Sequence, residues 1–341
     1  TKAPVGGALR VTYSGNYKGL VPDLRDYNLV NAAEKLDIEK RAGVYNESYK
    51  ALQSQGILED LKHKELEVLR GVNTYWLSEP VRPVFNHRHA LSIEGGDNAL
   101  RYKIYAGLND APGVMKYTGV YGKSGSIDIR YRKGKILLSN ILFLDQSNSD
   151  RTSRYGSFDD YARLNPYYRK YDTHGQIPRL LETATYKDGV QYGRIIDNPM
   201  YNTLLNTFDR NEAFDVRNAL KIEYLPLESI RVSLDATISR GLSENSAFKP
   251  AQHGDFVAIH DIKSKGSFIW NRTQRKGYDV SLTMSYNNMF ANKHFISSFA
   301  HFNIKEDLLH TIGIHQTGFP NEYMDEVFLG AMTKGLSGDE R

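Results

Sequence analysis

The chain has 341 residues, and its 44 lysines and arginines against 40 aspartates and glutamates give a net charge of +4. This small excess argues against a dedicated nucleic-acid binder, whose cations would cluster on one face. The lack of cysteine excludes disulfide scaffolds, thiolate zinc sites and cysteine nucleophiles, and a mean hydropathy of -0.52 excludes a bundle of transmembrane helices. The composition does not exclude a membrane β-barrel, because the lipid-facing and lumen-facing residues of a barrel alternate and average to a polar composition.

The strongest local pattern is an alternation of apolar and polar residues. Along Leu100–Asn109, one set of alternate positions is apolar and the other carries Arg101, Lys103 and Asn109. Successive side chains of a strand point to opposite faces, so this stretch is predicted to be a strand with one apolar side. Many of the predicted strands are about as long as a strand that crosses a bilayer at a tilt. The pattern predicts about nine antiparallel strands, at 9–18, 85–95, 100–109, 120–132, 135–146, 214–224, 230–239, 278–286 and 294–316.

Short and long connections alternate along the chain. Tight turns are predicted at 95–99, 133–135, 225–229 and 287–293, and long connections at 20–84, 109–119, 147–212 and 242–266. An up-and-down sheet then carries its turns at one end and its loops at the other, as outer-membrane barrels do. A soluble β-sandwich or β-propeller with functional loops is the alternative. The small, polar run Gly335–Arg341 closes no predicted element.

The first long connection is predicted to be partly helical. Asn28 can cap a helix that runs to Ala42, with Gly43 as its C-terminal stop. Leucines at helical spacing predict a second helix over Leu58–Leu69. We expect both helices to pack on the rim of a barrel or the edge of a domain.

The sequence offers little that points to catalysis. It contains no P-loop, HExxH or GxSxG motif. His87 and His89 share one strand face and could hold a metal, but no third ligand is evident. Asp159 and Asp160 could form a glycoside hydrolase pair, although adjacent carboxylates usually belong to a solvated loop. We therefore expect no enzyme activity, no metal and no cofactor.

The segment from Tyr155 to Asp172 interleaves aromatic side chains with charged and amide ones. Aromatic faces stack on sugar rings or apolar groups, while carboxylates and guanidiniums hold hydroxyls or amides. The segment is therefore a candidate for binding or gating. The alternative is a loop that is ordered by its own aromatics and docked on neighbouring loops. The candidate ligand-binding residues are Tyr155, Phe158, Asp159, Asp160, Asn165, Tyr167, Tyr168 and Arg169.

Several stretches, taken in order, resemble the SusC/RagA-like TonB-dependent transporters of the Bacteroidetes outer membrane. The opening TKAPVGGALRVTYSGNY resembles the passage from the plug domain into the first barrel strand. NTYWLSE, from Asn73, is similar to a segment of that family, and SFDDYARLNPYYRKYD and NPMYN resemble its long extracellular loop. DLRDYNLVNAA, from Asp23, the strands from Phe85 to Tyr105 with GVMK at 113–116, and GFPNEYMDEVFLG, from Gly318, complete the resemblance, which covers essentially the whole chain.

The resemblance implies a 22-stranded barrel that is plugged by an N-terminal domain. It further implies TonB-driven import of glycan oligomers or peptides across the outer membrane of a Gram-negative cell, with a SusD-like surface lipoprotein as the lid. The substrate within those two classes stays open. About nine strands cannot close such a barrel, so we expect residues 1–341 to be a fragment of the transporter or one part of a split protein, without the plug, the TonB box and the remaining strands.

The resemblance also gives the two strand faces a meaning. The apolar positions would face lipid, and the charged positions would face the lumen. A nucleic-acid partner is not expected. Two alternatives stay open: a secreted or periplasmic β-rich carbohydrate-active enzyme, and a surface adhesin or other structural β-protein. The expected lumenal residues are Arg101, Lys103, Asp128, Arg130, Asp215, Arg217, Lys221, Glu223, Arg231 and Asp235.

Overall fold

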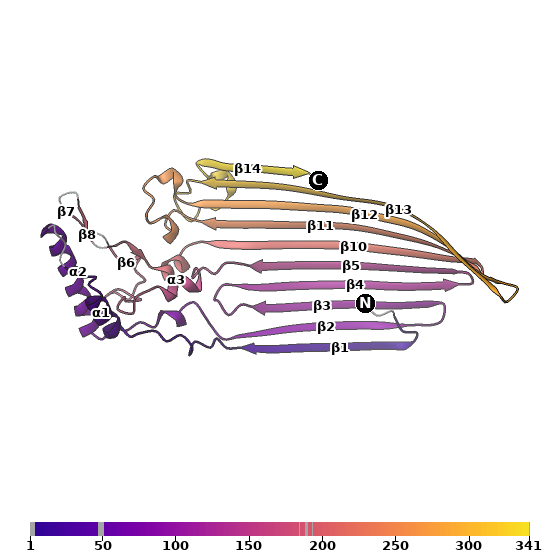
Figure 1. Cartoon of the computed structure of the whole chain (residues 1–341), viewed down its shortest axis with the longest axis horizontal. Helices are drawn as coiled ribbons and strands as arrows, with labels where there is room; N and C mark the ends of the chain where they lie inside the picture. The colour runs from indigo at the N-terminus through magenta and orange to yellow at the C-terminus, as the bar shows by residue number, and fades with distance from the viewer. Residues whose placement is uncertain (1–3, 47–50, 184, 188–189, 193, 341) are drawn as a thin grey trace.

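One antiparallel sheet of ten strands dominates the computed structural model, which describes residues 4–46, 51–183, 185–187, 190–192 and 194–340. Each long strand pairs with the next long strand of the chain, and Figure 1 shows them side by side. The predicted all-β, antiparallel class is therefore confirmed. The strands are β1 (Gly7–Leu20), β2 (Val84–Gly96), β3 (Leu100–Pro112), β4 (Gly119–Lys133), β5 (Ile136–Asp150), β10 (Phe208–Leu227), β11 (Ile230–Lys249), β12 (Ser267–Phe290), β13 (His294–Thr317) and β14 (Met332–Glu340).

Strand β14 is the main departure from the predicted strands. The run from Gly335 was expected to close no element, but its described residues pair with β13, with Gly335 opposite His315. Small and polar residues suffice there because the neighbouring strand supplies the hydrogen bonds. Strands β11 and β12 also extend far beyond their predicted bounds, which shortens the predicted loop 242–266 to 250–266, and the loop predicted at 147–212 occupies 151–207.

The connections separate to the two ends of the sheet. At one end, which we call the turn end, β2–β3, β4–β5, β10–β11 and β12–β13 are joined by short turns. The opposite end, which we call the loop end, carries the long connections and all three α-helices (Figure 1). Gly134, with φ 56°, allows the tight turn between β4 and β5. No helix among the described residues combines the length and the apolar character that a bilayer crossing requires.

Helix α1 (Ala32–Arg41) begins three residues later than predicted, because Asn31 and not Asn28 caps it. The Glu34 N–H donates to Asn31 Oδ1 at 2.9 Å, and the Asn31 N–H donates to Glu34 Oε2 at 2.9 Å. This reciprocal capping box needs a Glu or Gln three residues after the cap, which Asn28 lacks. Gly43, with φ 75°, follows the helix as predicted.

Helix α2 (Ala51–Leu69) contains the predicted segment Leu58–Leu69 and is longer. The connection between β5 and β10 carries helix α3 (Phe158–Ala162) and two small two-stranded sheets. One pairs β6 (Leu180–Glu182) with β9 (Ile196–Asp197), and the other pairs β7 (Thr185–Lys187) with β8 (Val190–Tyr192).

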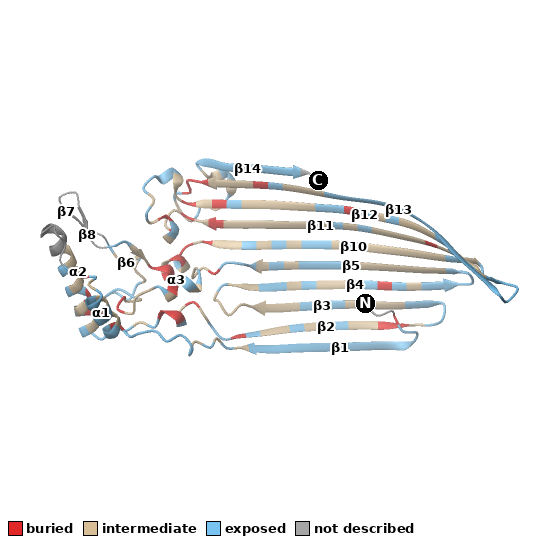
Figure 2. Cartoon of the chain, viewed as in Figure 1, coloured by how far each residue is buried: buried red, intermediate tan, exposed pale blue. Residues whose placement is uncertain are grey.

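The apolar core of the chain lies in its loops and at the loop-end tips of β11 and β12, and not under the sheet. Figure 2 shows buried residues concentrated at the loop end, whereas much of the sheet is exposed or half-buried. Trp76, Tyr161 and Phe319 are fully or almost fully buried, but Ile238 and Phe302 in the middle of their strands are 65% and 66% exposed. Nothing in the described chain covers the apolar side of the sheet, which therefore requires an apolar environment from outside.

Candidate functional site

The register places the apolar alternate positions on one continuous face, which we call the apolar face. Ile104, Ile127 and Leu142 lie opposite one another across β3, β4 and β5, and the same alternation continues through β13. From Ile230 to Ile238, β11 keeps this face apolar. The eight steps between these residues, at about 3.3 Å each and tilted by about 40°, rise about 20 Å. This height is close to the apolar band of about 25 Å on membrane barrels.

The apolar face changes character toward the loop end. On six successive strands, the apolar run ends at a charged or glutamine side chain. These side chains form a border across the sheet whose height differs from strand to strand. They are Lys123, Gln146, Glu212, Arg240, Lys276 and Glu306.

The opposite face, which we call the charged face, holds all ten residues that were expected to line the lumen. Arg10, Glu94, Lys103 and Asp128 lie opposite one another in register across β1 to β4, so their charges alternate in sign. Arg10 forms an ion pair with Glu94. Farther along, Lys221 lies 3.0 Å from a Glu223 oxygen and 3.8 Å from an Asp235 oxygen. One face of the sheet is thus polar, with charged side chains paired to one another, while the other face is apolar.

Two long connections meet at the loop end and share one apolar core. The connection between β1 and β2 contributes Ala32, Trp76 and Leu77, and the connection between β5 and β10 contributes Tyr161 and Met200, with Tyr167 and Tyr168 in the same cluster. Two stretches that carry the family resemblance also touch directly. Thr74 Oγ1 donates to the carbonyl of Tyr168 at 2.7 Å, and Trp76 Nε1 donates to that of Asn165 at 3.0 Å.

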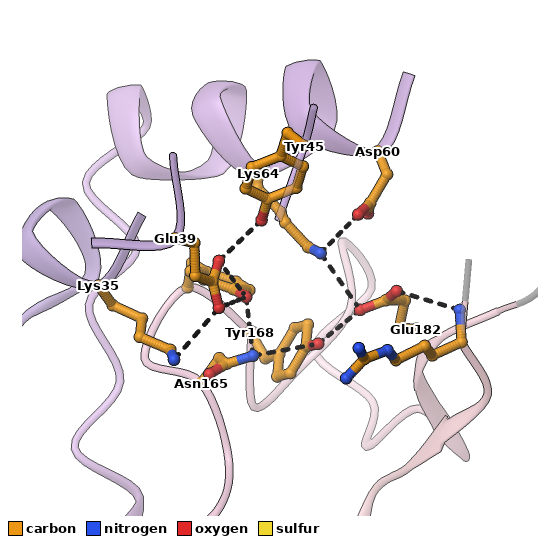
Figure 3. Close-up of polar contacts among 10 residues, drawn as sticks. Lys35, Glu39, Tyr45, Asp60, Lys64, Asn165, Tyr168 and Glu182 are labelled. Atoms are coloured by element: carbon orange, nitrogen blue, oxygen red, sulfur yellow. Dashed lines mark hydrogen bonds and ion pairs between the residues drawn. The ribbon is translucent and has the colours of Figure 1, made fainter. Parts of the chain in front are cut away.

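A buried polar network joins the same two connections (Figure 3). The hydroxyls of Tyr45 and Tyr167 donate to the Glu39 carboxylate at 2.7 and 3.1 Å, and Lys35 lies 3.2 Å from it. A second carboxylate, Glu182, accepts from the Tyr168 hydroxyl at 2.5 Å. The Tyr167–Glu39 hydrogen bond joins residues 128 positions apart in the sequence, so no local pattern predicted that the two connections meet here.

Lys64 of α2 is the cation at the centre of this network. The residue is 8% exposed, and its Nζ lies 2.6 Å from Asp60 and 3.7 Å from Glu182. The ring centroids of Tyr45 and Tyr167 lie 5.4 and 5.5 Å from the same nitrogen. Burial raises the pKa of Tyr167 and of Tyr168 above the ordinary value, so both hydroxyls stay protonated and act as donors.

The predicted ligand-binding residues divide into two groups. Tyr167 and Tyr168 are buried, Tyr155 and Phe158 pack against the shared core, Asn165 donates to the Tyr167 hydroxyl at 2.7 Å, and Arg169 pairs with Glu67 of α2. These six order the connection on its neighbours, which was the alternative interpretation of this segment.

Asp159 and Asp160 form the second group, because both are exposed. Asp160 accepts from the Ser157 N–H at 2.8 Å and so completes the capping box of α3, whose N-cap is Ser157. Asp159 forms an ion pair with Arg163 at 2.6 Å. They remain the accessible members of the predicted set.

A pocket of about 300 Å³ lies beside this segment. The start of α1, the segment 73–76 and residues 162–166 enclose it. Its lining mixes cations, amides and an aromatic ring, with Lys35, Asn73, Tyr75, Arg163 and Asn165 among them. Such a mixture suits a ligand with carbonyl, hydroxyl or carboxylate groups and an apolar part.

The exposed side of α2 corrects the expected packing of its leucines. Leu58, Leu66 and Leu69 point to solvent, and Leu69 is 83% exposed. The helix docks instead through Lys64 and Glu67, because the ion pairs with the connection between β5 and β10 lie on that side. The leucines are left as an apolar stripe at the loop end.

His87 and His89 share the apolar face of β2 and make separate contacts. His87 Nε2 lies 3.4 Å from Asp110, and His89 Nδ1 lies 2.6 Å from the Tyr13 hydroxyl. In the part of the chain that the structure describes, no three or more His, Cys, Asp or Glu side chains gather as a metal site would require.

A single-layer meander with one exposed apolar face, one charged face and all long loops at one end defines a segment of an outer-membrane type β-barrel. Solved structures of the same fold are those of the RagAB peptide transporter. One has a TM-score of 0.73 at 16% identity and covers 100% of this chain and 40% of its own. The importer in its "open-open" and "closed-closed" states matches with a TM-score of 0.72, at 16% identity, covering 100% of this chain and 39% of that chain in both cases.

The likeness confirms the predicted barrel fold. The chain spans about 40% of the length of the transporter chain that it matches. No family model matches the sequence. No curated protein matches it either.

Proposed function

We propose that the chain is part of a SusC/RagA-like TonB-dependent transporter in the outer membrane of a Gram-negative cell. The observation that carries the proposal is the exposed apolar face, which the described chain leaves uncovered over a height close to that of a bilayer core. The barrel fold shared with the RagAB peptide transporter supports it. On this proposal the whole of residues 1–341 is a barrel section, with its long loops outside the cell.

The charged face would line the lumen and contact a plug domain, through which TonB acts. The position of the N-terminal segment supports this orientation. Gly6 lies so close to Arg101 that an added Cβ would be 3.0 Å from its Nε, and Arg101 belongs to the charged face. The chain thus approaches β1 from the side on which a plug would lie.

A barrel section of this kind needs further strands. Strands β1 and β14 each have one long edge without a partner among the described residues. Unpaired backbone groups in hydrocarbon cost several kcal/mol each, so residues 1–341 alone should form no pore. Stable, heat-modifiable folding of this segment in liposomes would refute that expectation.

The cargo would be a glycan oligomer or a peptide that enters from the loop end. The pocket beside Asn73 and Asn165 offers amides and cations to such a molecule, and the exposed carboxylates of Asp159 and Asp160 lie on the same connection as Arg163 of its lining. The rest of the predicted ligand-binding set would act by holding this connection in shape.

A SusD-like lipoprotein is the proposed partner at the loop end, and the leucine stripe of α2 is a surface that it could cover. Replacing Leu66 and Leu69 by Asp in the full-length protein should abolish co-purification of the lipoprotein while the barrel still folds. Replacement of Leu58 alone by Gln serves as a milder control, because Leu58 is about as exposed as Leu66 (42% against 43%).

Growth of a deletion strain on a panel of polysaccharides and peptides tests the function as a whole. A transporter predicts loss of growth on one class of polymer, and the same loss when TonB is depleted. Hydrolysis of the polymer by the purified protein would favour the carbohydrate-active enzyme, and unchanged growth on every source would favour an adhesin.

A further inference from the structure

Two cations lie directly opposite each other at the loop-end border of the apolar face. On β11 this face carries Leu234, Ala236 and Ile238 and then changes to Arg240; on β12 it carries Leu282, Val280 and Tyr278 and then changes to Lys276. Arg240 and Lys276 are register partners, and both are exposed. Like charges directly opposite on one face of a sheet destabilise it.

Neither cation has a carboxylate partner among the described residues. Their other register neighbours in the same row are Val216 on β10 and Leu308 on β13, both apolar. Glu244 and Glu306 are the carboxylates closest to them along this face. Glu244 accepts from Trp270 Nε1 at 2.8 Å, and Glu306 lies opposite Tyr278. In the part of the chain that the structure describes, no carboxylate lies within 4.0 Å of the charged groups of Arg240 or Lys276.

The parts of the transporter that lie outside residues 1–341 cannot supply the missing anion. Strands β11 and β12 are interior strands, with β10 and β13 occupying their outer edges, so no further strand can lie beside them. A plug would contact the charged face, whereas Arg240 and Lys276 are on the apolar face. Their partner must therefore come from the surroundings of the barrel.

The height of the pair on the sheet identifies the chemistry of that partner. An anion at the edge of an apolar band of bilayer height is the headgroup of a lipid. Arg holds phosphate oxygens in a planar fork and Lys adds a point charge. Ile238 and Tyr278, the next register pair toward the turn end, offer surface for an acyl chain. We propose that Arg240 and Lys276 bind the phosphate group of a membrane lipid in the leaflet at the loop end.

This inference rests on the proposed membrane-barrel function, and its test keeps the two apart. Full-length protein is extracted from outer membranes in a neutral detergent, stripped of lipid, and titrated with bis-phosphorylated lipid A or with the same lipid lacking both phosphates. Native mass spectrometry counts the bound lipids. Wild-type protein should prefer the phosphorylated lipid, and the double variant Arg240→Gln/Lys276→Gln should bind it at least tenfold more weakly.

Arg275→Gln is the matched control. Arg275 is the neighbour of Lys276, is also exposed, and faces the other side of the sheet, so this variant should bind as the wild type does. Equal binding by the double variant, equal binding of both lipids, or displacement of the lipid by an equal concentration of inorganic phosphate would each overturn the site. Failure of the wild-type protein to localise to the outer membrane would instead overturn the proposed function.

Discussion

Asn140 and Asn218 form an amide pair in the middle of the apolar face, on β5 and β10. Asn140 Nδ2 donates to Asn218 Oδ1 at 3.0 Å, and Asn218 Nδ2 donates to Asn140 Oδ1 at 3.2 Å. Their register partners on this face are Leu220 and Leu142. If this face lies in hydrocarbon, each amide depends on the other, because neither water nor lipid tails can replace it.

Replacing one amide should therefore cost more than replacing both. Asn140→Leu leaves the Asn218 amide without a partner, at a cost of about 1–3 kcal/mol, whereas the double replacement by Leu should be nearly neutral or stabilising. The two single costs then add while the double cost is near zero, so the coupling between the two sites should be about 2–6 kcal/mol, measured as a double-mutant cycle. Heat denaturation of the full-length barrel, followed by its mobility shift on semi-native gels, ranks the four proteins.

The charged face provides the control pair. Ser243 Oγ donates to Asn211 Oδ1 at 3.1 Å, also across two strands, but on the side that would face water. Asn211→Leu and Ser243→Ala should show little coupling, since water can satisfy whichever group remains. If the costs of the single replacements at Asn140 and Asn218 simply add up in the double variant, the apolar face does not lie in hydrocarbon.

Further predictions concern the membrane band, the loop network and pH. Leu234→Lys should cost about 2–4 kcal/mol if this side chain lies near the bilayer midplane. Ser233→Lys should cost far less, because residue 233 lies opposite Glu223 on the charged face. Equal loss of stability in the two variants, measured by heat denaturation on semi-native gels, would contradict the membrane band. Lys64→Met leaves the half-buried Asp60 and Glu182 carboxylates without their cation, at a cost of at most about 3–5 kcal/mol, so α2 should become sensitive to protease. Unchanged protease resistance would mean that the network contributes little to the stability of α2. The hydrogen bond to His253, together with Lys249, holds the pKa of Asp255 well below its usual range, so its stabilisation of 250–266 is complete above about pH 4 and is lost at lower pH. Hydrogen exchange of this loop, corrected for intrinsic rates, should show that loss in the wild type and a smaller pH dependence in Asp255→Asn, in which Asp261 of the same loop keeps its lowered pKa.

The strands were predicted best where one face of the strand is apolar and the other is polar. Between Ile230 and Ile238, apolar and polar residues alternate strictly, and the structure has a strand there. The first part of β12 was missed because Arg272, Gln274 and Lys276 take the positions that are apolar lower down, beyond the border of the band. Both faces are polar there, so the alternation loses its contrast although the hydrogen-bond ladder continues.

The loop assembly was predictable only in its parts. The aromatic segment and the stretch from Asn73 were recognised separately, but their contact joins Thr74 to Tyr168. A periodic pattern describes neighbouring residues only, so it cannot predict a contact between residues so far apart in the sequence. The same holds for Glu39 and Lys64, which are charged residues within the two predicted helices. Burial of these charges depends on partners from the other connection, and one sequence does not show which partners meet.

The shared core of the two long connections has a consequence for how the sheet assembles. Most strand pairs close over a short turn, but β1–β2 and β5–β10 must close loops spanning 21–83 and 151–207, each at an entropic cost of about 3–4 kcal/mol by the logarithmic length dependence. Because these loops pack on each other, ordering one lowers the cost of ordering the other. The two pairings should therefore form as one cooperative step around the β2–β5 meander, which makes the loop core a nucleus for this part of the barrel.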